Sequence, residues 1–205
     1  MRNNKLIGLV LSIAFAIAII GCSKKHDKNP GQPVKSVEKS KNFNANPDVS
    51  IHQAALNGEN VLVVELLQNG FDVNKTDADG RTALMYAAFN GHTDLVNILL
   101  ENKAFVDMPD ASGRTALMFA ASGPFPETVK LLLDHKADPN VVDFEEKFTA
   151  LMFAASEGHI ETVKILLDRK ADPTMKDIDG DTALTFAQKN GHTEVAALLR
   201  SHLSR

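Results

Sequence analysis

A seven-residue phrase returns four times along the chain, and this repetition restricts the possible folds more than any other feature of the sequence. Each copy begins with Thr-Ala-Leu, has Met or Thr next, and continues with an aromatic residue and Ala. The copies occupy residues 82–88, 115–121, 149–155 and 182–188, so they are 33, 34 and 33 residues apart. Such a period is typical of stacked supersecondary units, none of which buries its apolar face alone.

The same order of local signals surrounds each copy. In the unit that begins at Asp77, a polar turn contains Gly80, and Thr82 is placed to cap a helix. Gly91 is placed to end that short helix. Residues 93–101 then carry apolar side chains at helical spacing, which predicts a second helix.

This pattern resembles the ankyrin repeat, whose usual phrase is Gly-x-Thr-Pro-Leu-His-x-Ala-Ala-x-x-Gly-His. Here Ala replaces the family's Pro, and Met or Thr replaces its first His in all units but the first. The resemblance covers residues 48–205 and implies an all-α solenoid of about five helix-turn-helix units with β-turn or hairpin fingers. The units span about 48–76, 77–109, 110–142, 143–176 and 177–205.

Two departures from the repeat lie near the middle of the array. Pro124 and Pro126 stiffen the loop between the helices of the third unit. The turn at 143–148 is one residue longer than the others and lacks their Gly, which places Phe144 and Phe148 on a normally polar finger tip. Two interpretations remain open: both rings are exposed anchors for a partner, or they fold back onto adjacent repeats.

The first 21 residues have the layout of a secretory signal. Residues 1–5 are short and basic, and residues 6–20 are almost continuously apolar but shorter than the ~20 residues that span a bilayer. The following Gly21-Cys22 resembles the bacterial lipobox, in which cleavage before Cys leaves a thiol that is modified with lipid. Cys22 is the only Cys of the chain. The alternatives are an uncleaved anchor or a plain signal peptide with an unmodified Cys.

Residues 22–47 are expected to form a lipidated Cys and a flexible, Lys-rich tether. They contain three prolines and few large apolar side chains, so they cannot offset the entropy of ordering. The six lysines either approach anionic head groups or belong to a solvated linker. Ser23 resembles the outer-membrane address of bacterial lipoproteins. We therefore expect a lipid-anchored, periplasm-facing protein of the bacterial cell envelope, at the outer membrane.

Charge and residue spacing argue against several kinds of chemistry. Residues 48–205 carry a net charge of −10, which repels phosphate backbones, so nucleic acid is not an expected partner. His92, His159 and His192 recur at the repeat period, so the architecture explains their spacing without a metal. The sequence contains no nucleophile elbow or phosphate-binding loop. We expect no enzyme activity, metal or cofactor.

The resemblance implies that another protein binds the concave face formed by the fingers and the first helices. Its contact positions mix acidic residues with a few aromatics, which suits a partner with a basic patch and an apolar pocket. They fall on Ala78, Asp79, Arg81, Phe89, Asn90, Ala111, Ser112, Arg114, Ser122, Phe144, Glu145, Glu146, Phe148, Ser156, Glu157, Ile178, Asp179, Asp181, Lys189 and Asn190.

Three functional hypotheses follow, each for a chain that is a monomer when free. The first is a membrane-tethered protein that sequesters or neutralises another protein, for example an immunity protein against an envelope-targeted effector such as a phospholipase. The second is an assembly or protective factor for a periplasmic or stress-response enzyme. The third, an undetected hydrolase, requires a pocket with coupled titratable groups.

Overall fold

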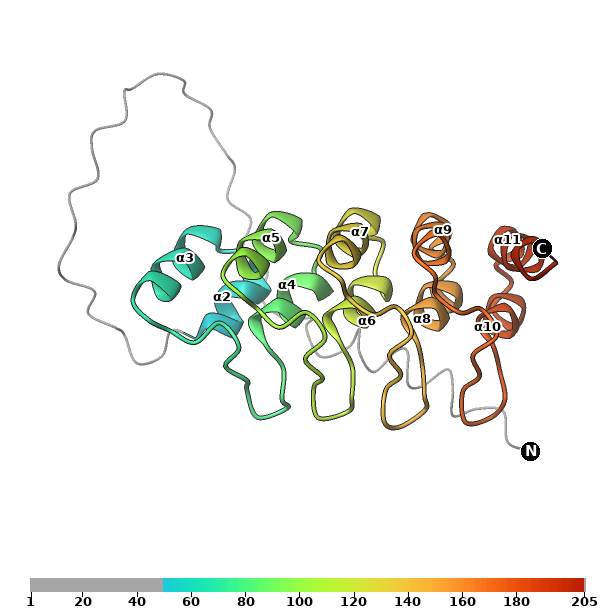
Figure 1. Cartoon of the computed structure of the whole chain (residues 1–205), viewed down its shortest axis with the longest axis horizontal. Coiled ribbons are helices and arrows are strands. Elements are labelled where there is room, and N and C mark those ends of the chain that lie inside the picture. The colour runs from blue at the N-terminus through green and yellow to red at the C-terminus, as the bar shows by residue number, and fades with distance from the viewer. Residues whose placement is uncertain (1–49, 205) are drawn as a thin grey trace, which may run out of the picture. The chain divides into compact units, whose positions relative to one another are not determined.

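The computed structural model describes residues 50–204, which form ten α-helices in five antiparallel pairs (Figure 1). This part of the chain contains no strand, and the predicted all-α solenoid is confirmed. None of its helices is long and apolar enough to cross a membrane. The predicted signal peptide (1–21), lipidated Cys22 and tether (22–47) lie outside the described residues.

The ten helices form two rows, and each pair contributes one helix to each row (Figure 1). The first helices are α2 (Ile51–Asn57), α4 (Ala83–Phe89), α6 (Ala116–Ala121), α8 (Ala150–Glu157) and α10 (Ala183–Lys189). The second helices are α3 (Asn60–Gln68), α5 (Thr93–Glu101), α7 (Pro126–Asp134), α9 (Ile160–Asp168) and α11 (Thr193–Leu203).

Local sequence signals determine where the first helices begin. The side chains of Thr82, Thr149 and Thr182 each accept a hydrogen bond from the backbone N–H three residues later, as N-caps do. Ser50 caps α2 through the backbone N–H of His52. The repeated phrase of the sequence is therefore a helix start in the last four units, with Thr115 at the same place before α6.

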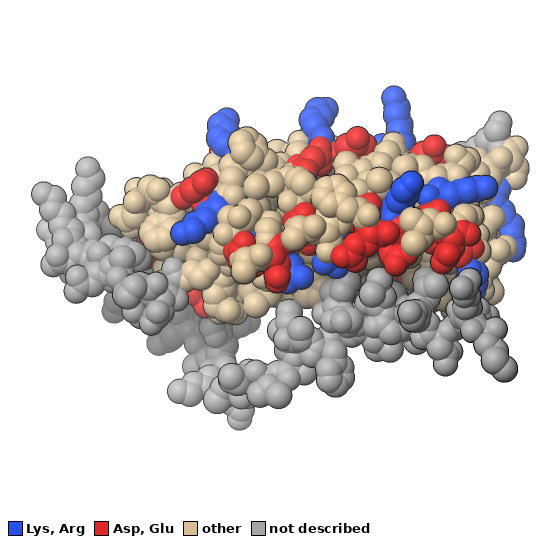
Figure 2. All heavy atoms as spheres, turned by 90° about the horizontal axis from the view of Figure 1, so that it is seen from below, with Lys and Arg blue, Asp and Glu red and all other residues tan. Residues whose placement is uncertain are grey.

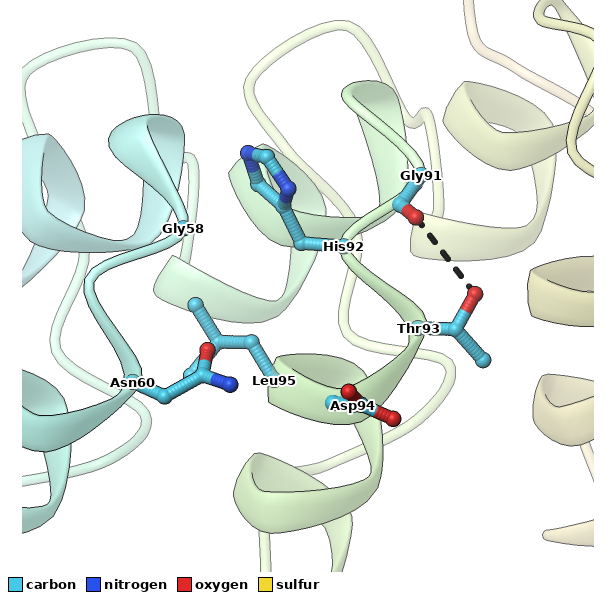
Figure 3. A pocket seen from close by; sticks show the side chains of 7 residues that line it. All are labelled: Gly58, Asn60, Gly91, His92, Thr93, Asp94 and Leu95. Carbon is cyan, nitrogen blue, oxygen red and sulfur yellow. Dashed lines mark hydrogen bonds between the residues drawn. The ribbon is translucent and has the colours of Figure 1, made fainter. Parts of the chain in front are cut away.

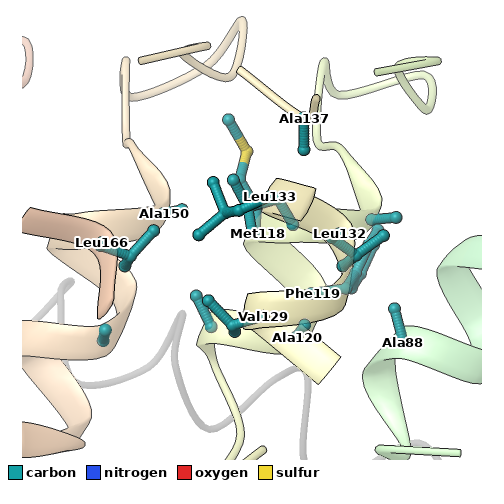
Figure 4. Close-up of a cluster of buried hydrophobic side chains, with 14 of the residues drawn as sticks. Ala88, Met118, Phe119, Ala120, Val129, Leu132, Leu133, Ala137, Ala150 and Leu166 are labelled. Carbon is teal, nitrogen blue, oxygen red and sulfur yellow. The ribbon is translucent and has the colours of Figure 1, made fainter. Parts of the chain in front are cut away.

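The core is a continuous apolar layer between the two rows of helices. Ala residues of the first helices are completely buried, and their small size lets neighbouring first helices pack closely. Leucines of the second helices, such as Leu132 and Leu166, fill the space between the rows (Figure 4). Each unit therefore buries its apolar face against its neighbours, as a solenoid requires.

The loops between the two helices of a unit tie one repeat to the preceding one. The imidazole of His92 donates to the carbonyl oxygen of Leu56 at 3.1 Å, and that of His192 donates to the carbonyl oxygen of Ser156 at 2.9 Å. His159 makes the equivalent contact with Ser122 at 3.3 Å. These periodic histidines are therefore structural. In the third unit Phe125 takes the place of the His.

The fingers are turns that connect the second helix of one unit to the first helix of the next. Each finger takes the number of the unit that it begins, so the described residues contain the second to fifth fingers. In each finger the side chain of the leading Asp accepts two backbone N–H groups, as Asp110 does from Ser112 and Arg114. Neighbouring fingers are joined by single backbone hydrogen bonds. These run from Ala111 N to Asp79 O, from Phe144 N to Ser112 O and from Ile178 N to Glu146 O, at 2.9, 2.8 and 3.1 Å.

Candidate partner-binding surface

In each of the last four units, one side chain lies at the corner where the finger meets the first helix. It belongs to the residue just before the capping Thr, and it differs in chemistry from unit to unit: Arg81, Arg114, Phe148 and Asp181. Beside it lies the aromatic residue of the repeated phrase: Tyr86, Phe119, Phe153 and Phe186. The scaffold is thus constant here, while the chemistry of the corner side chain varies from unit to unit.

In the second and third units this corner is a compact cluster of charged and aromatic groups. The guanidinium carbons of Arg81 and Arg114 lie 6.0 and 5.4 Å from the ring centroid of Phe119. Nε of Arg114 is 3.3 Å from Oδ2 of the buried Asp110, and Nε of Arg81 is 3.9 Å from the same atom. Both arginines are thereby held over the aromatic ring with part of each side chain still exposed.

The hydroxyl of Tyr86 extends this cluster into the second finger by donating to Oδ2 of Asp77 at 2.6 Å. Burial acts to raise the pKa of Asp77, but hydrogen bonds from Tyr86 and from the Arg81 and Asp79 backbones outweigh it and lower the pKa. The Asp77 carboxylate is therefore a stable acceptor that fixes the finger against α4.

The fourth unit differs because its finger contains the additional residue. Lys147 adopts a left-handed backbone (φ 59°), as Gly80, Gly113 and Gly180 do in the other fingers. This turn directs Phe148 inward, where only 6% of the side chain is exposed. The prediction that Phe148 contacts a partner is therefore wrong.

Phe148 instead packs between two aromatic residues of the corner. Its ring centroid lies 5.4 Å from that of Phe153 and 5.0 Å from that of Phe186, both in edge-to-face geometry. Ser156 is likewise only 8% exposed, because Asn190 donates its side-chain amide to the Ser156 hydroxyl and carbonyl. These two positions are parts of the fold.

Phe144 is the exposed member of the pair, with 70% of its surface accessible. Its ring lies against the third finger, so close that a Cβ added to Gly113 would come within 2.6 Å of the ring. The hydroxyl of Ser112 donates to Glu145 Oε1 at 3.1 Å and fastens the same two fingers together. Phe144 therefore has one face supported and the other open to solvent.

The tips of the fourth and fifth fingers also carry the acidic side chains of Glu145, Glu146 and Asp179, beside the exposed Lys147 of the fourth finger. Figure 2, which looks onto the finger side, shows Asp and Glu gathered toward the C-terminal half of the array. Burial, together with the carboxylates of Asp143, Asp179, Asp177 and Glu145, raises the pKa of Glu146. The tips therefore carry a crowded negative charge next to Phe144 and to Ile178, which is 55% exposed.

The other predicted contact residues are accessible to different degrees. Ala78, Asp79, Ala111 and Asp179 are exposed on the fingers, whereas Phe89, Ser122 and Glu157 are half-buried near the ends of the first helices. Asn90 donates to the carbonyl oxygen of Leu56 at 2.7 Å, so its amide joins two repeats. Lys189 pairs with Asp181, which neutralises the corner of the fifth unit.

Sequence reasoning missed a second set of exposed apolar residues outside the fingers. Phe105 is 65% exposed in the loop after α5, and Val61 is exposed on α3. Phe105 occupies the position of Asp72, Asp138 and Asp172 in the other units. An alignment of the repeats at this loop identifies Phe105, because an aromatic residue stands where the other units have a turn-forming Asp.

The described residues contain a small open hollow of about 310 Å³ between α3 and α5 (Figure 3). It is lined by Gly58, Asn60, Gly91, His92, Thr93, Asp94 and Leu95. The imidazole of His92 at its edge already donates to the Leu56 carbonyl. This imidazole nitrogen therefore serves the contact between the first two repeats.

The stacked helix pairs and variable fingers define a repeat scaffold for protein–protein interaction. The family model of ankyrin repeats matches residues 51–143 and 126–204, and the chain belongs to the ankyrin-repeat family. No curated protein matches the chain in a sequence search.

Proposed function

We propose that this chain is a membrane-tethered protein of the bacterial cell envelope that binds and sequesters a partner protein. The observation that carries the proposal is the exposed Phe144 ring, held against the third finger and flanked by acidic side chains. Exposed aromatics next to charged groups are typical anchors of protein interfaces. The lipobox-like sequence around Cys22 supports the tether.

Neutralisation of an envelope-targeted effector, for example a phospholipase, is the form of sequestration that we favour. A neutraliser needs a rigid binding surface and a location where the effector arrives, and it needs no catalytic group. The acidic repeat domain and the proposed lipid tether meet these two requirements. An assembly or protective factor for a periplasmic or stress-response enzyme has the same requirements, so the activity of the bound partner distinguishes the two roles.

The tether is tested by metabolic labelling with a radioactive fatty acid. We expect label on the wild-type chain and none on Cys22→Ser, because the thiol is the proposed acceptor. After cell fractionation, the wild-type chain should be found with the membranes and Cys22→Ser in the soluble fraction. Label that persists on Cys22→Ser would exclude lipidation at this residue.

Binding is tested by chemical cross-linking and purification of the full chain from cell envelopes. We expect a discrete partner with the wild type and with Phe105→Ala, and strong depletion of it with Phe144→Ala/Ile178→Ala. Phe105 is a matched control because it is equally aromatic and exposed but lies away from the fingers. A partner that is inactive while bound supports neutralisation, whereas an active or stabilised partner supports the assembly role. Absence of any partner with the wild-type chain contradicts sequestration.

A further inference from the structure

We infer that the tips of the third, fourth and fifth fingers dock a cationic amphipathic protein segment, in which apolar side chains are flanked by Lys or Arg. This inference rests on the proposed binding function and specifies the chemistry of the partner. The surface, called here the acidic tip surface, comprises Phe144, Glu145, Glu146, Ile178 and Asp179.

The aromatic anchor of this surface is held in position before any partner binds. The backbone N–H of Phe144 donates to Ser112 O at 2.8 Å, and the ring rests on Gly113. Gly113 has a left-handed backbone (φ 83°), so a side chain there would be strained as well as in collision with the ring. An anchor that is ordered before binding loses little conformational entropy when a partner covers it.

The acidic tip surface is continuous across neighbouring fingers. Ile178 N donates to Glu146 O at 3.1 Å, which joins the fifth finger to the fourth, as Phe144 joins the fourth to the third. Two apolar side chains, Phe144 and Ile178, are therefore presented on neighbouring fingers that are tied edge to edge. Repeat spacing of ~10 Å, which is the usual distance between packed helices, suits apolar residues about two turns apart on a partner helix.

The acidic tip surface carries several carboxylates close together. Glu145 and Asp179 are exposed, and Glu146 lies between them beside the buried carboxylates of Asp143 and Asp177. The basic side chain of the fifth corner, Lys189, is already paired with Asp181. Burial, and then repulsion from these carboxylates, raises the pKa of Glu146, and cations from a partner would relieve the repulsion.

Charge complementarity therefore favours a cationic partner segment at this surface. A cationic segment gains steering and pairing at the acidic tip surface, whereas an anionic protein or an anionic membrane is repelled by it. The net charge of −10 over residues 48–205 acts in the same direction at longer range. An apolar segment without cations would leave the carboxylates facing an uncompensated interface.

The test uses the full chain in non-ionic detergent and two fluorescent 14-residue peptides with the same helical apolar face. One peptide carries lysines on its polar face and the other carries glutamates. Fluorescence anisotropy should show saturable binding of the lysine peptide, weakening with added salt, and no binding of the glutamate peptide. Equal binding of both peptides, or no binding of the lysine peptide, would overturn the inference.

Two variants locate the binding. Phe144→Ala and the triple change Glu145→Gln/Glu146→Gln/Asp179→Asn should each weaken lysine-peptide binding about 10-fold, as loss of an interface anchor does. Phe105→Ala and Glu65→Gln/Glu127→Gln/Glu194→Gln are controls that remove an equal aromatic and equal charge elsewhere, and both should bind within about 2-fold of wild type. Losses that are equal in the controls and the tip variants would show non-specific attraction and overturn the inference.

The outcome is separable from that of the proposed function. Capture of a discrete partner that Phe144→Ala/Ile178→Ala depletes, combined with failure of the lysine peptide, would leave sequestration standing and exclude only the cationic class. Circular dichroism of each variant checks that the helices are retained.

Discussion

At the scale of single residues, Phe144 and Phe148 are four positions apart but have opposite roles. Phe148 is a core residue in contact with Phe153 and Phe186, and Phe144 is exposed. We expect Phe148→Ala to lower the free energy of unfolding by about 3 kcal/mol and Phe144→Ala to change it by less than about 0.5 kcal/mol. Urea denaturation measures both. Similar losses for the two variants would contradict the described finger.

Thr128 and Thr162 are buried at equivalent positions of neighbouring units but differ in their hydrogen bonding. Thr128 Oγ1 lies 2.7 Å from Thr93 Oγ1, in contact between α5 and α7. Thr162 is the equivalent of Thr128 one unit later, but Pro126 stands where Thr93 would be, and the buried Thr162 Oγ1 has no hydrogen-bond partner. Val195 occupies this position in the last unit.

Thr162→Val should therefore raise the free energy of unfolding by about 1 kcal/mol, because an unsatisfied buried hydroxyl is removed. The matched change Thr128→Val should lower it by about 1 kcal/mol, because the hydrogen bond between the Thr93 and Thr128 hydroxyls is lost. Both values come from urea denaturation. A destabilised Thr162→Val would imply a hydrogen bond at this hydroxyl.

Asp107 interrupts a ladder of asparagines that joins successive loops. Asn74 and Asn140 each donate to a carbonyl of the next loop and accept a backbone N–H from it. Asp107 accepts from Asp138 N, at 3.1 and 3.2 Å to its two oxygens, but as a carboxylate it cannot donate. Burial, followed by the charge of Asp138, raises the pKa of Asp107.

Because the pKa of Asp107 is raised in the folded state, protonation of this carboxyl stabilises the fold. This stabilisation is lost as pH rises through the pKa of the folded state. Asp107→Asn should therefore increase the free energy of unfolding at neutral pH by about 1 kcal/mol, through the missing donor. The gain should shrink as pH falls and the wild-type carboxyl becomes protonated. Thermal unfolding at several pH values tests this, and a gain that grows toward low pH would contradict the assignment.

At the scale of elements, the sequence predicted helices well because apolar spacing and caps are local signals. The second helix expected at residues 93–101 is α5, with the same bounds. The fourth finger was not predictable in the same way. The conformation of this finger depends on the left-handed backbone of Lys147 and on the space for Phe148 beside Phe186 of the next unit. Neither feature is visible in a local sequence pattern.

The backbone is also left-handed just after three of the second helices. Lys103, Lys136 and Lys170 adopt left-handed conformations (φ 71°, 72° and 67°), at the position where the first unit has Gly70 (φ 87°). A side chain in this region costs about 1 kcal/mol relative to Gly. We therefore expect Lys136→Gly to stabilise the protein by about that amount in urea denaturation.

The reverse substitution at the first unit is the control for this prediction. Gly70 has open space around its Cβ position, so Gly70→Lys introduces backbone strain without a collision. It should destabilise the protein by about 1 kcal/mol. Unchanged stability in both variants would contradict a backbone cost at these helix ends.

At the scale of the whole molecule, the repeated phrase specifies the scaffold, and the places where the copies differ specify the surface. The family's contact positions include Phe144 and Ile178, and both are exposed, because finger residues are displayed by any such array. They also included Phe148 and Ser156, which are buried by contacts with the following unit. Such contacts join residues more than thirty positions apart, so single-unit alignment does not reveal them.

The central claim is that the acidic tip surface holds a partner protein in the cell envelope. Photo-cross-linking in intact cells tests it most directly, with a photoreactive phenylalanine analogue in place of Phe144 in one strain and of Phe105 in another. The account predicts a discrete protein adduct from position 144 and none from position 105. No adduct at position 144, or the same adducts from both positions, would contradict it.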